Sequence, residues 1–267
     1  MRIGDAEAVV AVVMPCLDEE AAIGALVEAL RGLGVDEAIV VDGGSRDRTV
    51  ERAEAAGANV VVETRRGYGR ACAAGAAAAR PDAVVIAFMD GDGSDDPAFA
   101  ADVIGPALKN EVDFCMGSRL RGRSDPDALS AQQRAAGRLA GLLMRAAYGV
   151  RFTDMSPFRA IRRDRFETLG MTDKTYGWNL EMQMRVAARK LRVREVPVAC
   201  RRRMGGASKV SGNLKAALPA AWIIVRTFLC LAATFAPSAS RNEPNEGAEA
   251  APLAHRGDVA SDPSVRP

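Results

Sequence analysis

Histidine is almost missing from this 267-residue chain, which has a single one, His255. It lies in a C-terminal stretch, 237–267, that has no aromatic side chain and is dominated by Pro, Ala, Ser, Glu and Asn. Such a composition cannot bury enough apolar surface to fold, so it predicts a disordered tail. A reaction that depends on an imidazole base is therefore not expected in this protein.

Cysteine is also scarce, and its pattern excludes two common uses. The five cysteines form no C-x-x-C pair, and their odd number does not fit a complete set of disulfides or a zinc site. We expect reduced, buried thiols and a cytoplasmic protein. The first seven residues hold two acidic residues and no long apolar run, so no signal peptide is predicted. The net charge of +2 gives no reason to expect a nucleic-acid partner.

What the chain does have is a regular alternation of apolar and amphipathic segments. In the first half the apolar runs predict strands at 9–14, 38–41, 59–62 and 83–89, with helices between them at 19–31, 47–56 and 68–80. Continuous apolar strands separated by helices predict an α/β, Rossmann-like fold, a mostly parallel sheet with helices on both faces. The second half predicts strands at 112–116 and 191–198 and helices at 131–148 and 176–190.

The strongest chemical signal is the run DGDGSDDP at residues 90–97, directly after a predicted strand. Ligands of open α/β sheets bind outside the carboxyl ends of the strands, and four carboxylates crowd into seven residues at such an end. A divalent cation, Mg²⁺ or Mn²⁺, would relieve their repulsion and could neutralise a diphosphate. The alternative is a turn in which Ser94 or Asp96 caps a helix that begins at Pro97. The two interpretations are compatible.

Two other turns follow predicted strands, and a basic segment lies farther along. Asp42 begins the run DGGSRD and could accept hydrogen bonds from a nucleobase or ribose. The alternative is a turn in which Ser45 or Asp47 caps the start of the next helix. The run PCLDEE at 15–20 could contact a ligand or start a helix with acidic residues at its positive end. The run RRRMGGASK at 201–209 suits a phosphate cradle but also fits a solvated basic loop.

These stretches resemble the family 2 glycosyltransferases, which have the GT-A fold, and in particular the dolichyl- or polyprenyl-phosphate mannosyl- and glucosyltransferases. They occur in the family's order across about residues 8–213. The matching stretches are VVMPCLDEEAAI, IVVDGGSRDRT, RRGYGRACAAGAAAA, AFMDGDGSDDP, MGSRLRG, TDMSPFRAIRRD, TYGWNLEMQMRVAARKLRVREVPV and RRRMGGASKVSG.

The resemblance implies a site for a nucleotide-sugar donor, UDP-glucose or GDP-mannose, with a bound Mg²⁺ or Mn²⁺. One departure from the family is that Leu17 and Asp18 stand where Tyr and Asn often occur, so a ring that stacks on the base is missing. The implied donor-binding residues are Pro15, Leu17, Glu19, Asp42, Asp90 and Gly91. The implied metal ligands are Asp90, Asp92 and Ser94, with Asp92 favoured as the direct and catalytic one.

For the acceptor, the resemblance implies a polyprenyl phosphate. Arg119 matches an arginine that faces the donor or acceptor phosphate, and Arg134 and Arg138 lie on a helix that is implied to help hold the acceptor phosphate. The family's basic R-x-x-G-x-S-K loop is matched, with altered spacing, by Arg203, Ser208 and Lys209.

The expected reaction is a direct displacement at the anomeric carbon, with inversion. A phosphate acceptor is ionised at pH 7 and needs no strong base, which agrees with the lack of histidine. A hydroxyl acceptor would need a carboxylate base, for which Glu181 is the candidate, although it could equally be a structural carboxylate. Neighbouring Trp178 could flank the acceptor, but a place in the core is favoured.

Two rival functions use similar features. A sugar-phosphate nucleotidyltransferase would need a Gly-rich, basic loop after the first strand, where residues 15–20 are acidic instead. A scaffold that binds nucleotide sugars without catalysis would not need the intact acidic pair.

The predicted organisation is a GT-A catalytic domain over 1–215, an apolar amphipathic helix over 216–236 and the tail over 237–267. As a helix, the apolar run 220–236 would be about 25 Å long, short of the ~30 Å hydrocarbon core. It follows a stretch, 201–226, with six basic residues and no acidic one. We therefore expect peripheral docking on the inner face of the cell membrane, with a buried core helix as the alternative.

Overall fold

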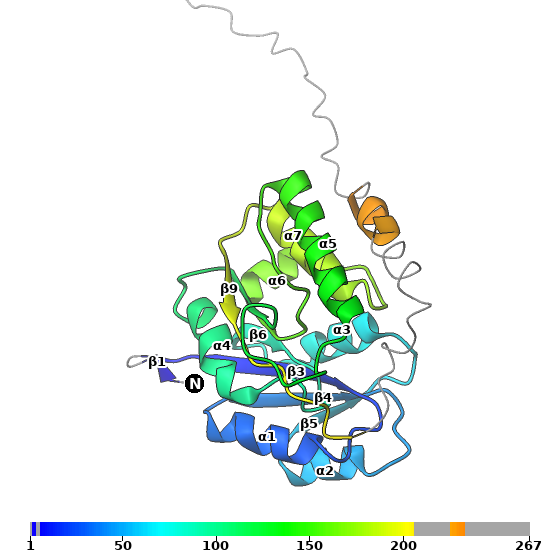
Figure 1. The fold of residues 1–267 in the computed structure, drawn as a ribbon. Helices are drawn as coiled ribbons and strands as arrows, with labels where there is room; N and C mark the ends of the chain where they lie inside the picture. The colour runs from blue at the N-terminus through cyan, green and yellow to red at the C-terminus, as the bar shows by residue number, and fades with distance from the viewer. Residues whose placement is uncertain (1, 4–5, 206–224, 233–267) are drawn as a thin grey trace, which may run out of the picture. The chain divides into compact units, whose positions relative to one another are not determined.

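The computed structural model describes residues 2–3, 6–205 and 225–232, and its centre is a mixed sheet (Figure 1). In these residues seven strands form the sheet in the order β5-β4-β3-β6-β8-β7-β9. Their bounds are β3 Val9–Cys16, β4 Glu37–Asp42, β5 Asn59–Val62, β6 Ala83–Phe88, β7 Phe114–Ser118, β8 Arg159–Arg162 and β9 Val193–Pro197. A separate pair joins β1 Arg2–Ile3 to β2 Ala6–Glu7.

The predicted mostly parallel sheet is confirmed. β5, β4, β3 and β6 run parallel to one another, β7 runs parallel to β9, and β8 alone is antiparallel to both of its neighbours. Since β4, β3 and β6 are adjacent and parallel, the turns that follow them lie at one edge of the sheet. This places the three acidic turns of the sequence side by side.

Helices cover both faces of the sheet, as predicted. One core contains side chains of α1 Ile23–Gly32, α2 Thr49–Ala55 and α4 Ala100–Leu108. The other contains side chains of α3 Tyr68–Ala78, α5 Ala131–Tyr148, α6 Arg163–Leu169 and α7 Trp178–Ala188. Alternate residues of β3 enter the two cores, Ala11 and Val13 on the α3 side and Val12 and Met14 on the α1 side, as the period of a strand requires.

The sequence predicts neither β8 nor α6, and a buried charge explains why the strand is missed. Arg159 opens β8 with no exposed surface, and its guanidinium donates to the backbone carbonyls of Ser156 and Asn179. An arginine at a core position interrupts the apolar pattern by which a strand is recognised. The strand is also short, so no further residues restore the pattern.

Residues 225–232 are helical, and part of this segment packs on the α3 side of the molecule. Phe228 and Leu231 join that core, and the ring centroid of Phe228 lies 6.3 Å from that of Tyr148 at the end of α5. Leu229 is 59% exposed. The rest of the predicted helix 216–236, and the predicted tail, lie outside the described residues. None of the described helices has both the length and the apolar character that crossing a bilayer requires.

Candidate active site

The turns that follow β3, β4 and β6 meet around one residue, Cys16. Cys16 pairs in register with Asp42, and the N–H of Gly43 donates to the Cys16 carbonyl over 2.9 Å. A Cβ placed on Gly91 would lie 2.2 Å from the Cys16 Sγ. The Asp-Gly-Asp turn therefore packs directly on the end of β3.

The pKa of the Cys16 thiol also indicates that the acidic turns meet at this residue. Burial raises the pKa of its thiol well above the ordinary value, and four carboxylates raise it further: Glu19, Asp42, Asp90 and Asp92. Coulomb interactions weaken with distance, so these side chains lie near one sulfur atom. The structure thus brings together the carboxylates that the sequence places on three separate turns.

Gly91→Ala is expected to lower the free energy of unfolding by about 1–3 kcal/mol, because the new methyl group would overlap the Cys16 sulfur. Urea denaturation of the single variants and of the double variant Cys16→Ala/Gly91→Ala measures this contact. Removal of the sulfur should recover part of the loss. A double variant no more stable than Gly91→Ala would contradict the packing explanation.

The acidic turn is crowded and only partly compensated. The Asp90 N–H donates to Asp95 Oδ2 over 3.0 Å, and the Tyr68 hydroxyl donates to Asp90 Oδ1 over 3.2 Å. Burial and then the neighbours Asp95 and Asp92 raise the pKa of Asp90 to about 8, and burial raises the pKa of Asp95 to about 6. Asp95 is 1% exposed, and its Oδ1 has no hydrogen-bond partner in the described part of the chain. A nearby cation would stabilise the charged form of both side chains.

The turn interpretation of this run holds at the same time. Asp96 accepts a hydrogen bond from the Ala98 N–H over 3.0 Å and caps the 3-10 helix η1, Pro97–Phe99. Asp92 Oδ1 accepts from the Ser94 N–H over 2.8 Å. Asp96 therefore serves as a cap, whereas Asp90 and Asp92 lie near Cys16.

The basic segment that begins at Arg201 lies on the acidic turn. The N–H groups of Arg201 and Met204 donate to the carbonyls of Ser94 and Asp92, over 2.8 and 3.1 Å. These backbone bonds hold the two oppositely charged segments against each other, although they are more than 100 residues apart in the sequence.

Arg203 joins the basic segment to two acidic turns. Its Nη2 lies 2.7 Å from Glu19 Oε1, and its Nε lies 3.2 Å from Asp92 Oδ2. Glu19, a predicted donor-binding residue, and Asp92, a predicted metal ligand, therefore share one arginine. The other predicted members of this loop, Ser208 and Lys209, lie outside the described residues.

The turns that follow β3 and β4 are each held by their own hydrogen bonds. Asp42 Oδ2 accepts from the N–H groups of Gly44 and Ser45 over 2.9 and 3.1 Å, so this carboxylate shapes the turn that follows β4. The Glu19 N–H donates to Thr49 Oγ1 over 2.8 Å. Pro15 lies next to the end of β3 and Leu17 just beyond it, both partly exposed at the same edge. A carboxylate can accept several hydrogen bonds, so these turn contacts leave Asp42 with capacity to accept more.

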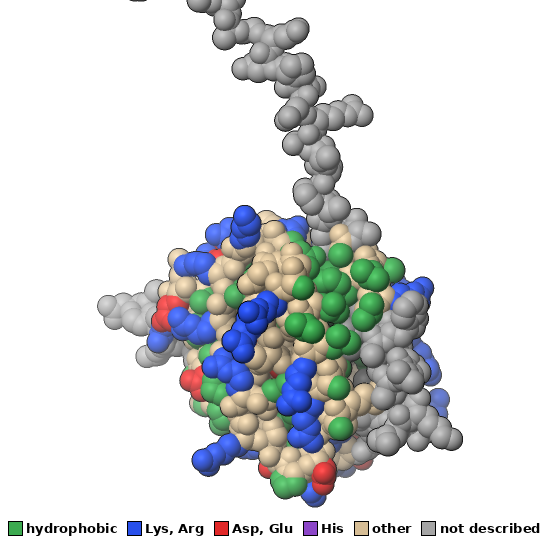
Figure 2. Space-filling model, turned by 45° about the horizontal axis from the view of Figure 1, so that its top comes forward, with side chains coloured by type: hydrophobic (Ala, Val, Ile, Leu, Met, Phe, Trp, Pro, Cys, Tyr) green, Lys and Arg blue, Asp and Glu red, His purple; other side chains and the backbone are tan. Residues whose placement is uncertain are grey.

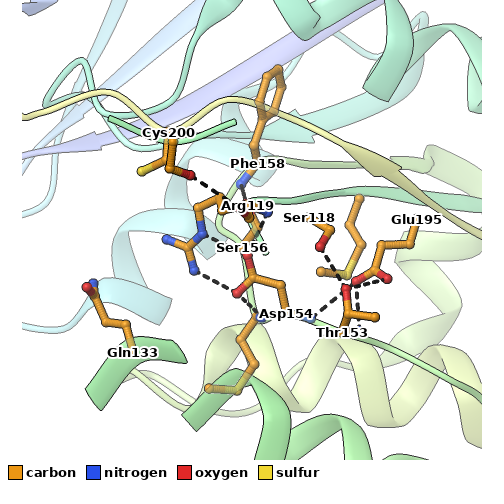
Figure 3. A network of polar contacts seen from close by, with 12 residues as sticks. Ser118, Arg119, Gln133, Thr153, Asp154, Ser156, Phe158, Glu195 and Cys200 are labelled. Atoms are coloured by element: carbon orange, nitrogen blue, oxygen red, sulfur yellow. Dashed lines mark hydrogen bonds and ion pairs between the residues drawn. The ribbon is translucent and has the colours of Figure 1, made fainter. Parts of the chain in front are cut away.

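Arg119 is fixed beside the acidic turn by a buried carboxylate (Figure 3). Its Nε and Nη2 lie 2.9 and 3.0 Å from the two oxygens of Asp154, whose side chain is 3% exposed. Burial opposes the charge of Arg119, but the hydrogen bonds to Asp154 raise its pKa overall. Burial raises the pKa of Asp90 and of Asp95, and the Arg119 charge offsets part of that rise.

A second layer of hydrogen bonds supports this pair (Figure 3). Thr153 Oγ1 donates to Glu195 Oε2 over 2.8 Å and lies 2.7 Å from Ser118 Oγ. The N–H of Asp154 donates to Glu195 Oε1 over 3.2 Å. These hydrogen bonds join β7 to β9 and to the segment before β8, which carries Asp154.

The predicted acceptor arginines do not touch the acidic turn in this structure. Arg134 and Arg138 are exposed on α5, whose start is fixed by a capping box between Ser130 and Gln133. Figure 3 shows Gln133, in the first turn of α5, on the side toward which the Arg119 guanidinium points. The N-terminal half of α5 thus borders the site, with both arginines at its outer surface.

Glu181 is buried and its carboxylate is fully engaged. It accepts from the N–H groups of Thr172 and Asp173, the latter over 2.8 Å, and pairs with Arg185 over 2.8 Å. Burial opposes its charge, yet these hydrogen bonds lower its pKa overall. Trp178, one turn earlier, is 1% exposed and lies in the core. These contacts favour a structural role for Glu181.

The loop that Glu181 holds contacts the start of α3. The carbonyls of Lys174 and Thr175 accept from the N–H groups of Arg70 and Gly69, over 3.2 and 3.1 Å. α3 begins at Tyr68, which donates to the acidic turn. Glu181 is therefore connected to the site through a loop and a helix start rather than by facing it.

Comparison with known proteins decides the family. The model of glycosyl transferase family 2 matches residues 11–170. An uncharacterized glycosyltransferase of Mycobacterium tuberculosis is 39% identical over 220 residues, 80% of this chain and 94% of the relative. The chain belongs to glycosyl transferase family 2. The present chain is also 33% identical, over 199 residues, to a dolichyl-phosphate hexose transferase of Haloferax volcanii. The match covers 73% of this chain and 84% of that relative.

The solved structures agree with the fold of this family 2 glycosyltransferase. Glucosyl-3-phosphoglycerate synthase of Mycobacterium tuberculosis, in complex with Mn²⁺, UDP-glucose and phosphoglyceric acid, superimposes with a TM-score of 0.65 at 23% identity. The match covers 85% of this chain and 80% of the synthase. The predicted GT-A fold is thereby confirmed, and the nucleotidyltransferase alternative is set aside by the family assignment.

The sequence does not predict the roles of several residues in the glycosyltransferase site. Tyr68 and Asp154 are assigned no role by the sequence, and Asp95 is counted only as one of four crowded carboxylates. The partners of Tyr68 and Asp154 lie 22 and 35 residues away, so spacing gives no signal for them.

Proposed function

We propose that this family 2 glycosyltransferase transfers a hexose, with inversion, from a nucleoside diphosphate sugar to a phosphate-bearing acceptor, a polyprenyl phosphate at the membrane surface. The observation that carries the proposal is the meeting of Glu19, Asp42, Asp90 and Asp92 around the end of β3, with Arg203 laid across them. A carboxyl edge with both signs of charge suits a donor that has a base, a ribose and a diphosphate.

The acidic turn fits a divalent metal ion. Its donors are carboxylate oxygens, which hard cations prefer, and Asp95 has a buried oxygen without a partner in the described part of the chain. In the described residues no group of three or more acidic, His or Cys side chains is arranged to hold a metal alone. Mg²⁺ usually binds one or two carboxylates together with substrate phosphates, so two carboxylates of this turn would be enough to hold it. Asp90 and Asp92, with Ser94, are the proposed ligands, and the bound ion would neutralise the departing diphosphate.

Two arginines of the chain supply the remaining positive charge. Arg203 is in reach of Asp92 and Glu19, so a diphosphate bound at the acidic turn would find it close by. Asp154 holds the Arg119 guanidinium in place. The positive charge of Arg119 favours the ionised form of the carboxylates in the acidic turn. Charge that is fixed before the reaction stabilises a leaving group without reorganisation.

The engagement of Glu181, the carboxylate considered as a base, favours a phosphate acceptor. Glu181 uses its oxygens on Thr172, Asp173 and Arg185, and the only histidine lies far along the chain at 255. A phosphate monoester is already ionised near neutral pH. Its oxygen attacks the anomeric carbon as the bond from that carbon to the donor phosphate breaks, and the nucleoside diphosphate leaves with the bonding electrons. Arg134 and Arg138 are proposed to attract the acceptor phosphate, and the likeness to a dolichyl-phosphate hexose transferase supports this acceptor class.

A soluble phosphate-bearing acceptor is the second candidate, because the solved synthase holds phosphoglyceric acid. Incubation with radiolabelled UDP-glucose or GDP-mannose, Mn²⁺ and either polyprenyl phosphate or phosphoglyceric acid separates the two. We expect an EDTA-sensitive, lipid-extractable product. Label found only in phosphoglyceric acid would replace the first acceptor by the second, and no product from any nucleotide sugar would contradict both.

Glu181→Gln is expected to lower the free energy of unfolding by roughly 1–3 kcal/mol, because Arg185 loses its buried counter-charge. The pH profile of kcat should keep its shape. A general base would instead give a fall in kcat of about 10²–10⁴-fold and the loss of one limb of that profile. Glu167→Gln, at an exposed ion pair on α6, is the matched control and should change neither property.

A further inference from the structure

The outer side of α5 carries a row of basic and apolar side chains. Arg134, Arg138, Leu142 and Arg145 are all exposed, Leu142 to 64%. Their spacing of four, four and three residues places them along one side of the helix. α5 contains no acidic residue.

These arginines are not neutralised, unlike those of the neighbouring helices. Arg163 of α6 and Arg185 of α7 each pair with a glutamate four residues away. Arg134, Arg138 and Arg145 form no ion pair with any described residue. The positive charges of this row are therefore available to a partner outside the described part of the chain.

The helical segment 225–232 packs against the end of α5. Its Phe228 ring contacts Tyr148 at the end of α5, and the next residue, Leu229, is 59% exposed. Arg226 is exposed as well, and the segment has no acidic residue. Figure 2 shows Lys and Arg side chains beside a broad hydrophobic area on one face of the molecule. We name the α5 face as Arg134, Arg138, Leu142, Arg145, Arg226 and Leu229.

We propose that the α5 face is the surface by which this glycosyltransferase docks on a bilayer that contains anionic lipids. This inference rests on the proposed function and adds to it the surface that meets the membrane. Unpaired arginines are attracted to anionic headgroups, on the order of fivefold in affinity for each one, and the exposed leucines can insert at the boundary of the acyl chains.

The direction of α5 suits a lipid-linked acceptor. At 1.5 Å per residue, Arg145 lies about 16 Å along the helix from Arg134. The same helix thus runs from the border of the site, where the acceptor phosphate is proposed to bind, to the proposed lipid contact. A polyprenyl phosphate carries its phosphate at the bilayer surface, so docking by this face brings that phosphate toward the site.

A second copy of the chain is a poorer occupant of the face. A two-fold interface is self-complementary, so it would place the arginine row of one copy against that of the other. Like charges so close together repel, and no acidic side chain of α5 is present to compensate them. An anionic surface has the opposite charge and needs no such compensation.

The test uses the full chain with phosphatidylcholine vesicles, with and without phosphatidylglycerol, in a co-sedimentation assay. We expect binding that requires phosphatidylglycerol and weakens with salt. The double variant Leu142→Glu/Arg145→Glu should bind at least about tenfold more weakly. Leu33→Glu/Lys109→Glu, at exposed positions on the α1 and α4 side, should bind like the unchanged protein. Circular dichroism confirms that both variants fold.

Transfer to a short, water-soluble isoprenyl phosphate without vesicles separates the two proposals. Unchanged transfer by Leu142→Glu/Arg145→Glu together with lost vesicle binding supports the docking surface. Vesicle binding that is equal in the two double variants, or a change of oligomeric state in place of lipid binding, overturns it. Vesicle binding without any sugar transfer would leave the docking surface standing and contradict the proposed function.

Discussion

Asp92→Asn is expected to reduce sugar transfer by about 10²-fold or more while the protein stays folded. Asp92 lies at the carboxyl edge of the sheet, where it faces Arg203 and accepts from the Ser94 N–H. The amide keeps the size of the side chain and an oxygen for the Ser94 N–H. It loses the negative charge that the proposed metal ion and Arg203 both require.

Three measurements make this result specific. Transfer rates give the loss of activity, thermal denaturation with and without Mn²⁺ gives the loss of metal binding, and circular dichroism confirms the fold. Asp102→Asn, at an exposed position in the first turn of α4, is the matched control and should behave like the unchanged protein. Activity and Mn²⁺ stabilisation near normal in Asp92→Asn would mean that the acidic run is only a turn.

Asp154→Ala is expected to lower the free energy of unfolding by about 3–5 kcal/mol, the largest effect on stability that we predict. The substitution leaves the guanidinium of Arg119 buried without its bidentate partner, and it also removes the acceptor for the backbone N–H of Arg119. Arg119 would no longer be fixed beside the acidic turn, so activity should fall as well.

A double-mutant cycle separates the pair from its surroundings. Replacing both partners, as Arg119→Met/Asp154→Leu, removes both buried charges together and should cost less than Asp154→Ala alone. Chemical denaturation of the four proteins gives the coupling energy. A loss below about 1 kcal/mol for Asp154→Ala would show that the pair behaves like an exposed ion pair.

The parallel half of the fold can be predicted from the sequence because its strands are apolar runs, and β3 and β4 are buried on both faces. β3, β4, β5 and β6 are continuous apolar runs, and the turns after them must lie at one edge. That logic places Asp42, Asp90 and Asp92 together before any coordinates are known. β8 escapes it because Arg159, a charged residue, occupies a core position.

The contacts that complete the site cannot be predicted in the same way. Arg203 reaches Glu19 across 184 residues of sequence, and such a pair is set by the whole fold. Glu181 shows the converse problem, since a carboxylate on a helix has the same sequence signal whether it is solvated, catalytic or buried. Only the loop at Thr172 and Asp173, folded back onto α7, shows where its oxygens are used.

The central claim is that a divalent ion at the carboxyl edge of the sheet binds the diphosphate of a nucleotide sugar. Calorimetric titration of the protein with UDP-glucose and with GDP-mannose, each with Mn²⁺ or with EDTA, tests it most directly. One of the two donors is expected to bind in Mn²⁺, and its binding is expected to be lost in EDTA. Binding that is equally tight with and without the metal, or no binding of either donor in Mn²⁺, would contradict it.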